Sequence, residues 1–161
     1  MASKIDPICE FREDHRKVRD GIIAISKALK EKDVATARGI LGELNTLTGP
    51  HFRYEEEYLY PAMRALLGEY VDQLITEHDN IIETAKTCVE LFAKDELTDE
   101  EAAEAEKAAM ALLIHVSNCD GLAILTERLS EDEMEDLAGR FAEAREAGVP
   151  LLEWADTIRK K

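Results

Sequence analysis

The sequence predicts an all-α fold, an up-down-up-down four-helix bundle with a short C-terminal helical extension. Four long segments repeat apolar or small residues at alternating steps of three and four, which is typical of helices packed along a common seam. The connections between these segments are short, so neighbouring helices are expected to run antiparallel. We expect a single domain over residues 1–161, with the bundle at about 6–128 and the extension at about 130–159.

Each predicted break carries residues that begin or end helices. Asp33 is placed to cap the second helix, and Gly68 separates the second helix from the third. Thr98 and Glu101 form a capping box before the fourth helix. Within the second segment, Gly49–Pro50 is expected to kink the helix at that point, because a proline lacks the backbone donor.

The residues after the fourth segment predict a shorter fifth helix. Ser130 and Glu133 form a second capping box at its start. The stretch "EAGVPLLEW" ends this helix. We expect Leu151, Leu152 and Trp154 to fold back as a cap on one end of the bundle, with a structural role.

The composition fits a globular protein and excludes several partners. Hydrophobic residues make up 45% of the chain and charged residues 34%, and the net charge is −15. Nucleic acids and anionic membrane surfaces require a basic face, so we expect neither as a partner. No signal peptide and no uninterrupted apolar run long enough to span a membrane are visible. The cysteines Cys9, Cys88 and Cys119 show no C-x-x-C spacing, which favours a reducing cytoplasm.

Polar residues within the apolar seams are the main indication of function. Each of the four segments carries one histidine on its seam, and these are all the histidines of the chain: His15, His51, His78 and His115. In an antiparallel pair, residues equidistant from the turn lie side by side. His15 and His51 are equidistant from the first predicted turn, at Asp33. His78 and His115 are equidistant from the third predicted turn, just before Thr98. Glu55, one turn after His51, is centred with His78 on the second turn. The sequence therefore predicts that all four histidines share one layer.

A layer of buried imidazoles with a carboxylate predicts a metal site. Without a metal, burying these groups would cost several kcal/mol unless all were paired. Imidazole with carboxylate suits iron, manganese or zinc. Four histidines supply two nitrogens to each of two ions, with Glu55 placed to bridge them. The fourth helix must then supply a second group. Cys119 has the inward position one turn after His115. Asp120 lies about 140° away on an ideal helix and reaches inward only if the helix distorts locally, which the following Gly121 would permit.

Three stretches resemble the motifs of a known family. "DHRKVRDGI", "HFRYEEEYLYP" and "HVSNCD" are similar to motifs of the hemerythrin and hemerythrin-like (HHE cation-binding) family, over roughly residues 8–125. The resemblance implies an oxo- or hydroxo-bridged non-haem di-iron centre within the bundle. The family's H-x-x-x-x-D pattern matches His115 and Asp120. The ligands implied for the two iron ions are His15 and His51 on one, His78 and His115 on the other, and Glu55 and Asp120 as bridges.

One departure from the family affects the expected function. Hemerythrins carry H-x-x-x-H on the third helix, where this chain has Leu74 in place of the first histidine. The second iron should then have two histidines rather than three, which leaves an additional open position. Cys119 stands where the other hemerythrin-like branch has a glutamate, and it is either a small buried side chain or a thiolate near the iron. Tyr54 and Tyr58 flank Glu55 and are candidates to hydrogen-bond a ligand of the iron.

These features favour a cytoplasmic di-iron protein that binds O2 or a related small oxidant, peroxide or NO, for oxygen binding or sensing. The alternative is an enzyme that reduces or disproportionates peroxide or NO, with an electron-donor protein as a candidate partner. This alternative is favoured by the open position that Leu74 leaves and by the adjacent thiol. A second alternative is iron storage or a degenerate metal-binding bundle.

Overall fold

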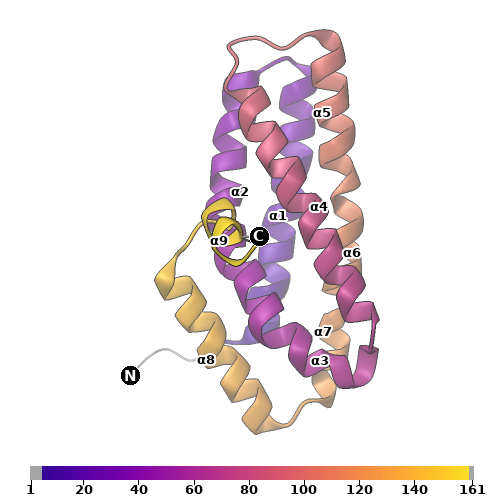
Figure 1. Cartoon of the computed structure of the whole chain (residues 1–161), viewed down its shortest axis with the longest axis vertical. Coiled ribbons are helices and arrows are strands. Elements are labelled where there is room, and N and C mark those ends of the chain that lie inside the picture. The colour runs from indigo at the N-terminus through magenta and orange to yellow at the C-terminus, as the bar shows by residue number, and fades with distance from the viewer. Residues whose placement is uncertain (1–4, 160–161) are drawn as a thin grey trace.

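The computed structural model describes residues 5–159, and the regular elements within that range are all helical. Four helical rods run up and down the long axis, as predicted (Figure 1). The first rod is α1 (Pro7–Lys30) and the third is α4 (Tyr70–Phe92). The second comprises α2 (Val34–Tyr54), the π-helix η1 (Glu55–Leu59) and α3 (Tyr60–Leu67). The fourth comprises α5 (Asp99–Ala111), α6 (Leu113–Asp120), α7 (Leu122–Leu125) and the 3₁₀ turn η2 (Thr126–Arg128), and the extension comprises α8 (Glu131–Ala147) and α9 (Leu151–Ile158).

The predicted helix ends are confirmed. Asp33 caps α2 by accepting a hydrogen bond from the backbone N–H of Thr36. The capping boxes that open at Thr98 and Ser130 are both formed. Gly68 ends α3 with a positive φ of 55°, a conformation that favours glycine. These capping residues and the glycine turn fix where each rod begins or ends, and the short connections make neighbouring rods antiparallel.

The second rod contains a π-helical turn that the sequence pattern does not predict. The α-helix continues through Gly49 and Pro50, where a kink was expected. The π-helical turn instead occupies Glu55–Leu59. A π turn adds one residue to the helical repeat, and such turns are frequent at functional sites. The π-helical hydrogen bonding therefore follows His51, in addition to the backbone donor that Pro50 lacks just before it.

The C-terminal extension covers the flank of the bundle and not one end, so that part of the prediction was wrong. Figure 1 shows α9 at mid-height, against α2 and α4. Its Leu151 and Trp154 form a buried apolar cluster with Phe52 of α2. Gly49 permits this approach, since a Cβ atom there would lie only 1.9 Å from the carbonyl oxygen of Val149. The absence of a side chain at Gly49 therefore positions the extension.

The histidine layer divides the apolar core of the bundle. On α1, Phe11 belongs to one cluster of buried residues and Ile22 to the other, with the histidine of that helix between them. On α4, Leu74 and Cys88 stand on opposite sides of the histidine in the same way. The polar layer is thus enclosed by apolar packing above and below.

The fourth rod contains a long apolar helical stretch. By length and composition alone, the helical stretch Asp99–Arg128 could cross a membrane, since an 18-residue window within it has a mean hydropathy of 1.6 and 28% of that window is buried. The stretch contains no uninterrupted apolar run of that length, so the sequence pattern did not indicate it. Such a stretch is weak evidence for a membrane span, because core helices of soluble proteins pass the same test. Here α5 and α6 pack against α1 and α4, and α6 carries His115 into the histidine layer.

Candidate metal centre

The four core histidines surround one buried carboxylate. His51 Nε2 lies 3.0 Å from Glu55 Oε1 and 3.2 Å from His15 Nε2. His78 Nε2 lies 3.6 Å from the same carboxylate oxygen. The rings of His78 and His115 are in contact, with centroids 4.7 Å apart. All five side chains are buried. The structure thus brings the histidines into the single layer that the turns predict.

A carboxylate from a neighbouring rod holds each imidazole from outside the layer. The four Nδ1–H groups donate in a closed ring around the bundle: His51 to Asp14 (2.8 Å), His78 to Glu56 (2.7 Å), His115 to Glu77 (2.7 Å) and His15 to Asp120 (3.0 Å). Because an ionised carboxylate only accepts, each Nδ1 carries a proton, which leaves the inward-facing Nε2 as the nitrogen that can bind a cation when the imidazole is neutral. Carboxylates orient metal-binding histidines in this way.

The centre of the layer holds acceptors without enough donors. Glu55 Oε1 is buried and has no hydrogen-bond partner among the described residues. Nε2 of His51 lies 3.2 Å from Nε2 of His15 and 3.0 Å from Glu55 Oε1, and a single proton on His51 Nε2 cannot serve both of these acceptors. Leaving a buried polar group unpaired costs about 1–3 kcal/mol, so a cation between these atoms would stabilise them. Two sets of ligand atoms lie within 4.8 Å of one another: His15 with His51 and Glu55, and Glu55 with His115 and Cys119. These residues therefore fit a metal centre.

Without a metal, protons distribute unevenly over the layer. Burial lowers the pKa of an imidazole, but the Glu55 carboxylate and the hydrogen bond to Asp14 outweigh burial and raise the pKa of His51 to about 9. Burial and the nearby His78 lower the pKa of His115 to about 4. Burial raises the pKa of a carboxyl group, yet His51 and His78 hold the pKa of Glu55 well below its ordinary value. Glu55 is therefore an ionised carboxylate at the centre of the layer.

A comparison with known families agrees with this geometry. The family model described as the hemerythrin HHE cation binding domain matches residues 6–123, a range that contains the four histidines and Glu55. The chain belongs to this family. No match was found among curated proteins or among solved structures. The matched range of this hemerythrin-like domain ends within α7, so α8 and α9 lie outside it.

In this hemerythrin-like domain, Asp120 does not take the place that the resemblance implies, whereas Cys119 faces the centre. Asp120 was expected to bridge the two ions, but it lies behind His15, and its side chain is 30% exposed. The reason is helical geometry, because a residue five positions after His115 points about 140° away from it and α6 remains helical through Asp120. Cys119 is fully buried, and its Sγ contacts Glu55 Oε2. Of the two alternatives, Cys119 has the inward position.

A tyrosine that the sequence analysis missed lies beside this sulfur. The Tyr60 hydroxyl donates to Glu55 Oε2 at 3.0 Å. The hydroxyl oxygen of Tyr60 also lies 3.1 Å from His78 Nε2 and 3.2 Å from Cys119 Sγ. The π-helix η1 explains its position, because the backbone N–H of Tyr60 donates to the carbonyl of Glu55 five residues earlier. In a regular α-helix the two side chains would diverge by about 140°. An alternating seam pattern therefore could not reveal Tyr60.

The two tyrosines that were predicted to flank the centre point elsewhere. Tyr54 packs against Phe141 of α8, with ring centroids 4.2 Å apart. The guanidinium of Arg140 lies over the ring of Tyr58, 5.1 Å from its centroid. Within the described range, neither hydroxyl hydrogen-bonds to the histidine layer. The phenol nearest the centre is therefore Tyr60.

The C-terminal extension reaches the centre through two arginines. Arg145 of α8 donates to Asp14, the carboxylate that holds His51, at 2.9 Å. Arg159, just after α9, donates to Glu56, the carboxylate that holds the histidine of α4, at 2.8 Å. An arginine keeps a carboxylate ionised and fixed in orientation. The extension therefore supports the site, beyond the structural cap that the sequence predicts.

Proposed function

We propose that this hemerythrin-like domain holds two iron ions and binds O2 or a related small oxidant. The observation that carries the proposal is the ring of carboxylates, which occupies the four Nδ1 atoms and directs the four Nε2 atoms toward one ionised carboxylate. The proposed ligands are His15 and His51 for one ion, His78 and His115 for the other, and Glu55 between them. Nitrogen and oxygen donors with a thiol close by suit iron, whereas magnesium and calcium prefer oxygen ligands alone.

Bound iron would supply an open coordination position and electrons for a small oxidant. The protein supplies a dry environment around it. Phe52 stacks on His78 with ring centroids 3.9 Å apart. Phe11 lies against the rings of His15 and His51, at 4.3 and 5.4 Å between centroids. These aromatic rings exclude water and restrict the imidazoles to one orientation. Tyr60 supplies a hydroxyl placed to donate to a small ligand at the shared carboxylate.

Metal content is the first test of the proposal. Protein purified anaerobically from iron-replete cells should contain about two irons per chain, as expected of a di-iron bundle. Exposure to O2 should then produce visible absorption, and removal of O2 should reverse it for a binding protein or sensor. A single iron, zinc or no metal would contradict the proposal and indicate a degenerate bundle. A large excess of iron per chain would contradict it in favour of storage.

An enzyme acting on peroxide or NO is the second candidate, and Leu74 favours it. Leu74 is fully buried in the apolar cluster that contains Tyr60 and Met63, so no imidazole occupies that position. For an enzyme, Leu74→His should lower peroxide or NO turnover and prolong the O2-dependent absorption. The neighbouring Ile75→His serves as the matched control. If neither property changes in Leu74→His, the absence of that histidine does not determine the activity.

A further inference from the structure

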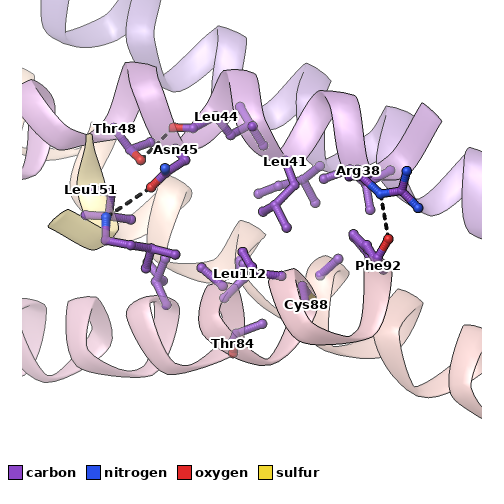
Figure 2. Close-up of a pocket in the computed structure, with 18 of the residues that line it drawn as sticks. Arg38, Leu41, Leu44, Asn45, Thr48, Thr84, Cys88, Phe92, Leu112 and Leu151 are labelled. Atoms are coloured by element: carbon purple, nitrogen blue, oxygen red, sulfur yellow. Dashed lines mark hydrogen bonds between the residues drawn. The ribbon is translucent and has the colours of Figure 1, made fainter. Parts of the chain in front are cut away.

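A large apolar cavity lies directly beside the histidine layer. Its volume is about 380 Å³, and α1, α2, α4, α5 and the start of α9 line it. Figure 2 shows Leu41, Leu44, Cys88 and Leu112 directed into it from opposite walls. Leu41 and Leu44 are only half-buried, and Val89 on the facing helix is 46% exposed, so the cavity opens to the surface between α2 and α4.

One end of the cavity lies about one helical turn from the histidine layer. Val18, Thr48, Ile81 and Leu112 line the cavity, and each lies three residues from one of the four core histidines in sequence. Three residues correspond to about one helical turn, so these four side chains lie immediately next to the imidazoles. A ligand that fills the cavity therefore ends close to the proposed metal ions.

The cavity is elongated and too large for a diatomic molecule. Arg38 lies at the end far from the histidines, ten residues before Thr48 on the same helix. At 1.5 Å per residue this separation is about 15 Å. At about 30 Å³ for each water-sized group, the volume accommodates roughly a dozen methylene-sized groups. O2 alone would leave most of this space empty. The dimensions therefore favour a single extended hydrocarbon chain.

The cavity has a cationic end. Arg38 is the one charged residue among the described residues that line it, in a chain of net charge −15. The guanidinium is exposed, and its Nε donates to the carbonyl of Phe92 at 2.6 Å, while Nη2 donates to that of Lys94 at 3.2 Å. These hydrogen bonds fix Arg38 at the rim of the cavity, as Figure 2 shows for the bond to Phe92. A fixed guanidinium at the rim suits a carboxylate.

We propose that this cavity binds a fatty acid of about a dozen carbons, with its carboxylate at Arg38 and the end of its chain next to the histidine layer. Burial of the hydrocarbon chain supplies the affinity, since the removal of each CH2 group from water is favourable. The guanidinium supplies the preference for an anionic head group. Binding depends on the cavity and not on iron, so it can be measured separately from the proposed function.

Two glycines of α2 allow a matched test of the cavity. A Cβ atom at Gly42 or at Gly39 would meet no atom within 4 Å, so either position tolerates a larger residue, but only Gly42 lines the cavity. Calorimetric titration with dodecanoate should show one site per chain. Gly42→Phe should weaken binding at least about ten-fold, and Gly39→Phe should leave it unchanged. The absence of saturable binding, or equal effects of both substitutions, would overturn the proposal.

Head-group variants test the role of Arg38. Arg38→Gln should weaken dodecanoate binding about ten-fold while leaving dodecanol binding unchanged, and Arg140→Gln on α8 is the control. Circular dichroism reports whether Arg38→Gln remains folded, and unchanged dodecanol binding shows that its cavity is intact. Dodecyltrimethylammonium binding as tightly as dodecanoate would overturn the assigned head group. A dimer in sedimentation that Gly42→Phe dissociates and dodecanoate does not would assign the cavity to a second copy of the chain instead.

Discussion

At the residue scale, each core histidine uses its two ring nitrogens differently. Nδ1 donates to a carboxylate outside the layer, and Nε2 faces Glu55 or its neighbours inside it. The carboxylate selects the tautomer, restricts rotation of the ring and makes Nε2 more basic. Affinity for a cation therefore depends on residues that never touch it.

Replacing one of these carboxylates tests this dependence. Glu77→Gln keeps an oxygen that can accept from Nδ1 of His115 but removes the charge. Metal affinity should fall roughly ten-fold, as is common when such carboxylates are lost. Competition with a chromogenic chelator measures the change, and Glu83→Gln, an exposed glutamate of the same helix, is the control. Equal metal affinities for wild type and Glu77→Gln would show that the ring of carboxylates does not contribute to metal binding.

The sulfur at the centre gives a second residue-scale prediction. Cys119 Sγ contacts the shared carboxylate, and bound iron would favour its thiolate. Cys119→Ser should then remove the charge-transfer absorption that a thiolate gives with ferric iron. Cys88→Ser, which changes a second buried thiol in the other part of the core, should leave the spectrum unchanged. An unaltered spectrum in Cys119→Ser would mean that the sulfur only fills space.

At the element scale, the second rod shows how one extra residue in a turn changes which side chains face inward. Up to Glu55 the alternating pattern identifies the inward positions. After the π turn the phase shifts, so that Tyr60 faces the centre and Tyr58 faces Arg140. Nothing in the apolar pattern distinguishes a π turn from a regular one, because the same residue types suit both. The prediction for Tyr58 failed for this reason, whereas Tyr54 precedes the π turn.

Docking of α9 against α2 depends on the absence of a side chain at Gly49. In Gly49→Ala the new Cβ would overlap the backbone around Val149 and Pro150, so α9 must shift away. Overpacking of this kind costs about 1–3 kcal/mol of unfolding free energy. Fluorescence of Trp154, the single tryptophan, should also shift to longer wavelength. Gly39→Ala, which meets open space, should instead stabilise the protein by about 0.5–1 kcal/mol. Matching changes in both variants would contradict this role of Gly49.

At the scale of the whole molecule, the sequence predicts the features that follow from residues near one another in the chain, namely the rods and the histidine layer. The rods follow from capping residues such as Asp33 and Thr98, and the layer follows from histidines equidistant from each turn. The ring of carboxylates could not be predicted in this way. Asp14 precedes His15 in the chain but holds His51 on the next rod, so its partner is determined only when the rods are assembled.

The whole layer also determines how the metal-free protein responds to acid. His115 has its pKa lowered to about 4 and His15 is lowered too, by burial and by a neighbouring imidazole, whereas an unfolded histidine titrates near 6.5. As the pH falls below about 6.5, the unfolded chain binds protons that the folded protein does not, so stability decreases. The depressed pKa of Glu55 acts in the same direction at lower pH.

Above neutrality the sign reverses, so the metal-free protein should be most stable near pH 6.5. His51 keeps its proton up to about pH 9 in the folded state, while the unfolded chain has already released it, so stability is lost as the pH rises through this range. The free energy of unfolding cannot change by more than about 1.4 kcal/mol per pH unit for each proton. Urea denaturation at about pH 5, 6.5 and 9 measures the profile. Iron loading should abolish the alkaline decrease, because coordination requires a neutral imidazole in the folded state. Stability that rises steadily from pH 6.5 to 9 in the metal-free protein would show that Glu55 and Asp14 do not hold the proton on His51.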